Sequence, residues 1–164
     1  MARPWKIPDL QPDEPLRGNL LKIAQGRFQE TFSYEEAIVE YADIEALHDM
    51  RVAARRLQAV LLIFQDCFPK KKLRKHRDNI QRLIKNLGRV READVFLEML
   101  QTHETISTNG GSVFSAEDSV ALDLLIAQEM HERVLARREL LRELRRLHAM
   151  EYETLFEKFL HESL

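Results

Sequence analysis

The chain has 164 residues, of which 45% are hydrophobic and 32% charged, and its formal net charge is -2. This length is enough for one domain with a real hydrophobic core, and the composition is ordinary for a soluble helical protein. The single cysteine, Cys67, excludes an intrachain disulfide, and we find neither a signal peptide nor an apolar run long enough to span a bilayer. We therefore expect a cytoplasmic protein with no membrane association.

The chain is expected to begin with an extended arm, because residues 1–12 contain three prolines. Trp5 is the candidate anchor of this arm. Residues 13–164 are predicted to form a single helical domain. Its first helix should run from about residue 15 to 40 and break near Phe32, where Ser33 and Glu36 have the spacing of a capping box.

The second helix is predicted to start after Asp43, a good N-cap residue, and to run to about residue 65. The third should run from Pro69 to about residue 87. Gly88 then predicts a kink or join before a shorter helix that ends near residue 102.

Residues 107–119 contain two glycines and are expected to form a loop. Ser115 or Asp118 would cap the last helical stretch, which should continue to about residue 160. No strand pattern competes with these assignments. Four or five helices of this length predict an all-α fold, an antiparallel four-helix bundle.

Basic residues are concentrated in one window of the sequence. Thirteen of the twenty-five Lys and Arg lie between residues 51 and 91, where the only acids are Asp66 and Asp78. At 100° per residue, six bases of the third predicted helix fall on one stripe: Lys71, Arg74, Lys75, Arg82, Lys85 and Arg89.

The second predicted helix repeats this arrangement. His48, Arg51 and Arg55 share one face, with Arg56 at its flank, opposite an apolar side. A further basic cluster on the last helix includes Arg138 and Arg142. Solvated helices usually mix charges of both signs, so two consecutive basic faces with almost no Glu favour a surface that binds a polyanion.

Other constellations do not predict catalysis or a cofactor. Glu45 and His48 form a Glu-x-x-His pair, but a di-iron bundle needs two such pairs and the second is absent. We find no glycine-rich phosphate loop and no nucleophile beside an activating base. We therefore predict a protein that is not an enzyme and has no metal or cofactor.

Two motifs carry a family resemblance. The segment His48-Asp-Met-Arg51-Val-Ala-Ala-Arg55-Arg56-Leu resembles the His-x-x-Arg-Val-x-x-Arg-Arg-Leu signature of CHAD domains, named for a conserved histidine on an α-helical scaffold. Residues 87–95, Leu-Gly-Arg-Val-Arg-Glu-Ala-Asp-Val, are similar to that family's Leu-Gly-x-x-Arg-Asp-x-Asp-Val. Glu92 replaces the usual aspartate.

The resemblance implies an all-helical, non-catalytic domain that binds inorganic polyphosphate and often accompanies triphosphate-processing enzymes. The matching motif positions are His48, Arg51, Arg55, Arg56 and Arg91. The basic residues of the third helix, together with Arg138 and Arg142, join this predicted site by charge alone. Protonated His48 can donate to a phosphate oxygen.

Family members typically contain two similar four-helix halves, and no second His-x-x-Arg segment follows residue 100. We therefore predict a half-domain that forms a homodimer, with the two basic faces turned toward a shared groove. Two alternatives remain for the basic surface. One is nonspecific nucleic-acid binding, although only Phe64 and Phe68 in this window are available for base stacking and both look core-facing. The other is a module that binds an acidic protein partner.

Overall fold

A computed structural model of the chain describes residues 3–109 and 116–164. Every regular element in these two ranges is helical, as the sequence predicts. The elements in chain order are α1 (Leu16–Phe32), α2 (Glu35–Tyr41), α3 (Ile44–Ile63), a short 3-10 helix η1 (Gln65–Cys67), α4 (Lys70–Asn109), α5 (Ala116–Ala149) and α6 (Tyr152–Ser163).

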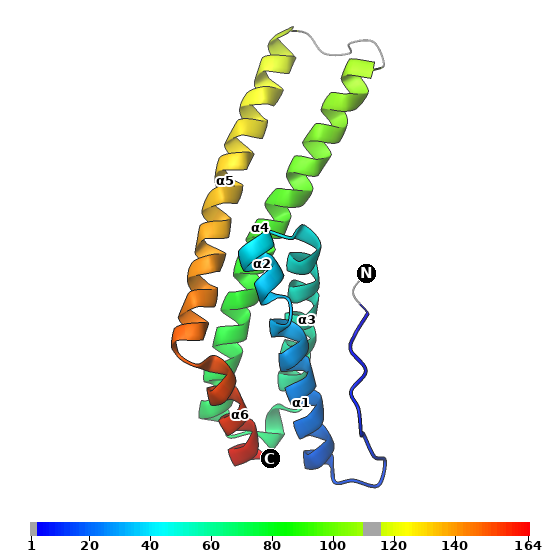
Figure 1. Cartoon of the computed structure of the whole chain (residues 1–164), viewed down its shortest axis with the longest axis vertical. Helices are drawn as coiled ribbons and strands as arrows, with labels where there is room; N and C mark the ends of the chain where they lie inside the picture. Colours follow the sequence, from blue (N-terminus) through cyan, green and yellow to red (C-terminus); the bar gives the residue numbers. More distant parts are fainter. Residues whose placement is uncertain (1–2, 110–115) are drawn as a thin grey trace.

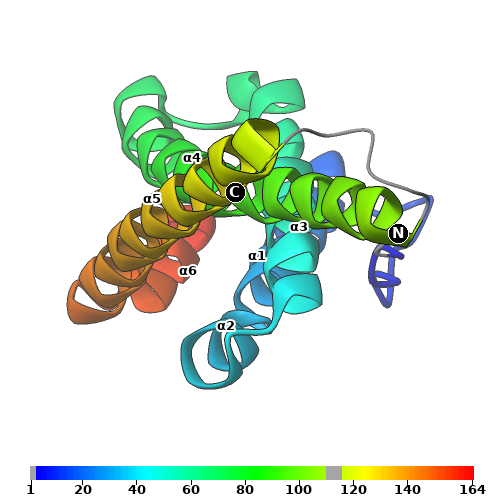
Figure 2. The same ribbon diagram turned by 90° about the horizontal axis from the view of Figure 1, so that it is seen from above.

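The two longest helices, α4 and α5, pack against each other and form the long axis of the molecule (Figure 1). α3 packs on α4, α1 packs on α3, and α6 turns back to contact both α1 and α5. Seen from above, α1, α2 and α3 lie together on one side of the α4–α5 pair (Figure 2). One continuous hydrophobic core joins these helices, with fully buried members such as Leu20, Met50, Leu87, Leu144 and Phe156.

α4 and α5 continue well beyond the ends of α2 and α3 (Figure 1). We call residues 92–109 of α4 and 116–132 of α5 the distal hairpin, and the rest of the molecule the body; the first turns of the hairpin still line grooves together with Ile44 and His48 of α3. This arrangement leaves the predicted closed four-helix bundle unconfirmed. In a four-helix bundle, α1 would pack directly on α5. Here α1 makes its main contacts with α3 and α6, and α6 in turn contacts α5.

Several predicted helix boundaries are confirmed. α1 ends at Phe32 and α2 starts at Glu35, so the first helical stretch breaks where the capping-box spacing indicated. The Asp43 side chain caps α3 by accepting hydrogen bonds from the backbone N–H groups of Glu45 and Ala46, at 2.8 and 3.1 Å. This cap fixes the start of the helix that carries the first motif.

The predicted kink at Gly88 is wrong, because α4 runs through this position as one helix. A glycine inside a helix costs only about 1 kcal/mol, and burial of Leu87 and Val90 on its two sides holds the helix in register.

The predicted loop is also shorter than expected, since residues 107–109 and 116–119 are helical. Asp118 therefore lies in the first turn of α5 and does not cap it, and Ser115 is outside the described residues.

The last helical stretch is two helices and not one. Glu151 adopts a left-handed conformation (φ 51°) between α5 and α6. This turn lets α6 fold back, so that Phe156 stacks on Phe28 of α1 with 4.5 Å between ring centroids and Tyr152 contacts the same ring. Aromatic burial therefore offsets the cost of a left-handed non-glycine residue.

The extended N-terminal arm is fastened through its backbone. The Trp5 N–H donates to Glu30 Oε1 at 3.1 Å, and the Trp5 carbonyl accepts from Arg27 Nη2 at 2.9 Å. The indole ring itself remains 44% exposed. Trp5 therefore anchors the arm as predicted, through these main-chain hydrogen bonds and a side-chain hydrogen bond with Tyr34.

Candidate polyanion-binding site

The two sequence motifs meet in one groove of about 420 Å³ between α3 and α4. His48 and Arg51 come from α3, and Arg91 comes from α4 about one helical turn beyond Gly88. The lining is completed by Glu92, Val95, Phe96 and Met99 of α4. Because α3 and α4 pack against each other, residues 40 positions apart in sequence share one site.

Arg51 lies beside Gly88 of α4, at a distance that would also leave room for a β-carbon. A β-carbon at this buried position would be 3.7 Å from Arg51 Nε and 3.8 Å from Glu92 Oε1. Arg51 Nε is itself buried and has no hydrogen-bond partner in the protein. A buried N–H donor without a partner costs about 1–3 kcal/mol, and an anion bound in this groove would relieve that cost.

The basic stripe of α4 is open to solvent. Lys71, Arg74, Lys75, Lys85 and Arg89 are all exposed. None of them forms an ion pair with an acid among residues 3–109 and 116–164. Their positive charges are therefore not cancelled within this part of the molecule, and they raise the local potential for an incoming anion.

Two further predicted residues have the same character. Arg55 of α3 and Arg138 of α5 are exposed, and neither is ion-paired within the described residues. Arg51 and Arg91 are half-buried in the groove and also form no ion pair there. Nine of the predicted Lys and Arg are thus available to bind an external anion.

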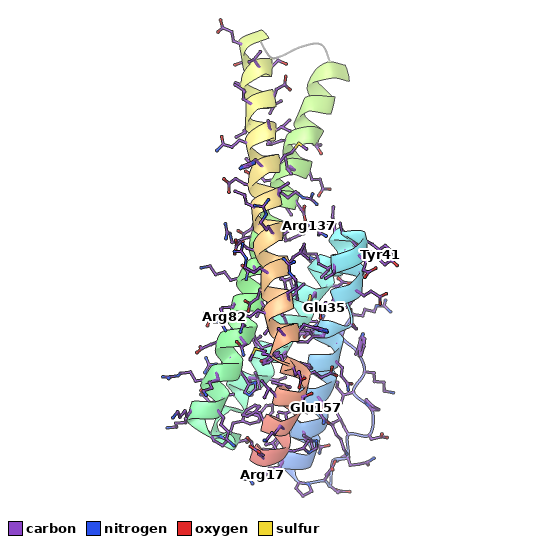
Figure 3. All side chains as sticks on the ribbon, turned by 60° about the vertical axis from the view of Figure 1, so that its left-hand side comes forward. Arg17, Glu35, Tyr41, Arg82, Arg137 and Glu157 are labelled. Carbon is purple, nitrogen blue, oxygen red and sulfur yellow. The ribbon has the colours of Figure 1, made fainter. Side chains whose placement is uncertain are left out.

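The other three predicted arginines are already engaged by carboxylates. Arg56 Nη1 lies 3.0 Å from Oε1 of the fully buried Glu30. Arg82 Nε lies 3.7 Å from Glu143 Oε1, on the side of the molecule opposite Tyr41 in Figure 3. The third contact joins Arg142 Nη1 to Glu139 Oε1 at 2.7 Å. Arg56 in particular is separated from the groove and ties α3 to α1.

The sequence did not reveal which acids hold these arginines. Glu30 is fully buried and also pairs with Arg27 and the Trp5 N–H. The position of Glu30 in α1 resembles that of any polar residue on an amphipathic helix. Arg27 is three residues away, but Arg56 is distant in sequence and only the packing of α1 on α3 brings it to Glu30.

The acids of the second motif have different roles. Asp94 is buried and pairs with Arg133 of α5, so it orients that residue and not the neighbouring Arg89 or Arg91. Glu92 is exposed at the groove.

Glu143 of α5, which lies outside this motif, holds Arg146 by two hydrogen bonds of 2.7 and 2.9 Å. These bonds raise the pKa of the Arg146 guanidinium.

No group of three or more His, Cys, Asp or Glu in the described residues is arranged to hold a metal ion. Likewise, none of the described helices has an apolar segment sufficient to cross a membrane.

The helical scaffold thus gathers His48, Arg51 and Arg91 in one groove, beside an exposed basic stripe on α4. The CHAD domain family model matches residues 22–164, nearly the whole chain, and the chain belongs to this family. The family is associated with polyphosphate-related proteins. No curated protein and no solved structure matches the chain.

Proposed function

We propose that the protein binds inorganic polyphosphate through the α3–α4 groove and the basic stripe of α4. The observation that supports this most is the buried, unpartnered Nε of Arg51, in a groove that also contains His48 and Arg91. A donor left without a protein partner is the feature expected of a residue whose partner is a ligand.

The dimensions of the stripe suit an extended anionic chain. Residues 71–89 of α4 span about 27 Å at 1.5 Å per residue. Bases that recur every three or four positions are about 5–6 Å apart. A flexible polyphosphate chain with about one charge per phosphate can contact several of them at once. Arginine forks and lysine ammonium groups bind phosphate oxygens without reading any sequence.

The role we propose is binding without catalysis. The groove offers the cationic donors of Arg51 and Arg91, which are suited to holding a phosphate chain. We further propose that the chain corresponds to one helical half of a two-bundle ligand channel, and that a triphosphate-processing enzyme is a natural partner.

Nucleic acid is the second candidate ligand, since its phosphates would also be attracted to the stripe. Base stacking, however, would need exposed aromatic rings. Between residues 51 and 91, Phe68 is buried and Phe64 packs against the core. Phe96 lines the groove but is half-buried, and the exposed stripe of residues 71–89 contains no aromatic residue except the half-buried His76. We therefore expect nucleic acid to bind more weakly than polyphosphate.

A competition experiment tests the proposal. Long polyphosphate, single-stranded DNA and RNA are compared at equal charge concentration over a series of salt concentrations. We expect polyphosphate to bind most tightly and its affinity to fall linearly in log–log form. By analogy with single-stranded nucleic acids, nine contacts would give a slope of about -6. Equal affinity for all three polymers, or a flat salt response, would contradict polyphosphate binding by this surface.

A further inference from the structure

The sequence divides its charge between the two ends of α4. Residues 92–132 contain nine Asp and Glu and no Lys or Arg, whereas residues 51–91 contain thirteen Lys and Arg and two acids. The distal hairpin is therefore strongly acidic, and the adjoining part of the body is strongly basic.

The two charges lie on one continuous face. Arg89, near the end of the basic stripe, lines a groove of about 430 Å³ together with Glu92, Glu129 and Glu132. Phe96 lines both this groove and the neighbouring groove that contains His48 and Arg51. No ion pair joins these three glutamates to the residues that the structure describes.

This face also carries exposed apolar side chains. Val95 and Met99 of α4, which line the His48 groove beside Phe96, are 47% and 46% exposed. The distal hairpin is only two helices thick, so its outer surfaces are not covered by the body (Figure 1). Exposed apolar residues beside charged ones are typical of a protein-interaction surface.

We propose that this face is the docking surface for a second copy of the chain, arranged antiparallel so that the distal hairpin of each copy lies on the basic stripe of the other. The stripe of residues 71–89 is about 27 Å long and the hairpin segment 92–109 is about 26 Å long, so the two match in length. A two-fold axis near the Arg89–Glu92 boundary makes the contact self-complementary, because basic meets acidic twice.

This arrangement replaces the basic-to-basic pairing expected from the sequence, in which like charges would repel. It also has a regulatory consequence that rests on the proposed function. The hairpin and polyphosphate would compete for the same bases, so polyphosphate would dissociate the dimer.

Charge reversal provides the test. One double variant, Glu129→Lys with Glu132→Lys, reverses the charge of the hairpin where its glutamates face Arg89, and leaves the His48 groove intact. A second, Lys85→Glu with Arg89→Glu, reverses the charge at the adjoining end of the stripe. The control, Glu153→Lys with Glu157→Lys, changes the net charge of the chain by the same amount as the hairpin variant, but at exposed positions of α6. Sedimentation velocity measures self-association of the full chain near 0.1 M and near 1 M salt, where screening lengths are about 10 and 3 Å.

We expect the wild type and the α6 control to dimerise at low salt and to dissociate at high salt. Each reversal variant alone should dimerise roughly tenfold more weakly or worse, since its contacts become repulsive. An equimolar mixture of the two reversal variants should form heterodimers, because both contacts are then attractive again. A wild type that stays monomeric, or a mixture that does not associate, would overturn the proposal.

A polyphosphate titration separates this inference from the proposed function. The hairpin variant keeps the whole basic site, so it should bind polyphosphate at least as tightly as the wild type. If it binds polyphosphate although the wild type never dimerises, the docking proposal fails and the proposed function stands. If neither protein binds polyphosphate while the mixture of reversal variants still forms heterodimers, the proposed function fails and the docking proposal stands.

Discussion

Replacing Arg51 with methionine separates ligand binding from folding in a way that few other positions allow. The side chain lies against Gly88 in the α3–α4 groove, and its Nε is buried without a protein partner. Methionine keeps most of the aliphatic volume and removes both the charge and the unsatisfied donor. The folded protein therefore loses no hydrogen bond or ion pair within its described residues.

The two expected effects differ in sign. A charge-assisted hydrogen bond to phosphate is worth about 1.5–3 kcal/mol, so Arg51→Met should weaken polyphosphate binding by roughly ten- to hundredfold. Removal of a buried unpaired donor relieves up to about 1–3 kcal/mol, so the free energy of unfolding should stay unchanged or increase.

Isothermal titration with polyphosphate and urea denaturation measure the two quantities. Arg17→Met is the matched control, because Arg17 is exposed in the first turn of α1, away from the groove (Figure 3). It should change neither affinity nor stability. The reasoning is refuted if the Arg51 variant binds polyphosphate as the control does, or if it is clearly less stable than the wild type.

Three further predictions concern stability. Glu30→Gln should lower the free energy of unfolding in urea by about 3 kcal/mol, because it removes the buried carboxylate that holds Arg27 and Arg56. The control Glu36→Gln, at an exposed position, should have no measurable effect on this free energy. His76 stacks on Phe159 with 4.3 Å between ring centroids, and burial, aided by Lys75, lowers its pKa to about 4. The unfolded chain takes up a proton on His76 near pH 6.5 and the folded chain only near pH 4, so the free energy of unfolding should fall as the pH drops between these values. His76→Phe should remove this pH dependence, and a variant whose free energy of unfolding still falls by the same amount would contradict the prediction. Gly88→Ala should raise stability by about 0.5–1 kcal/mol in thermal unfolding, since the added methyl meets only ordinary van der Waals distances; a loss of stability would mean that Arg51 needs the space.

Local signals in the sequence were sufficient for the helical class and for several helix ends. The Asp43 cap and the break after Phe32 depend on side chains within three residues, so local spacing predicts them. The prediction of a kink or join at Gly88 was wrong because it also used only local sequence. Its local preference is to interrupt a helix, and the packing of distant residues on both sides overrides that preference.

The candidate site could be predicted only as far as charge and motif extend. Helical spacing placed His48 and Arg51 on one face, the second motif added Arg91, and all three line one groove in the structure. Spacing could not separate Arg56 from this group, because its partner Glu30 comes from another helix. Which arginines have carboxylate partners depends on tertiary packing, and amphipathic periodicity contains no information about it.

Because α4 continues unbroken from the body into the distal hairpin, the positive and negative regions are held at a fixed separation along one rod. Such a rod has a permanent electric dipole along its length, although the net charge of the whole chain is only -2. A polyanion that diffuses nearby exerts a torque on this dipole and turns the basic end toward itself before any contact forms. Encounters should therefore be oriented as well as accelerated, and added salt should abolish both effects together.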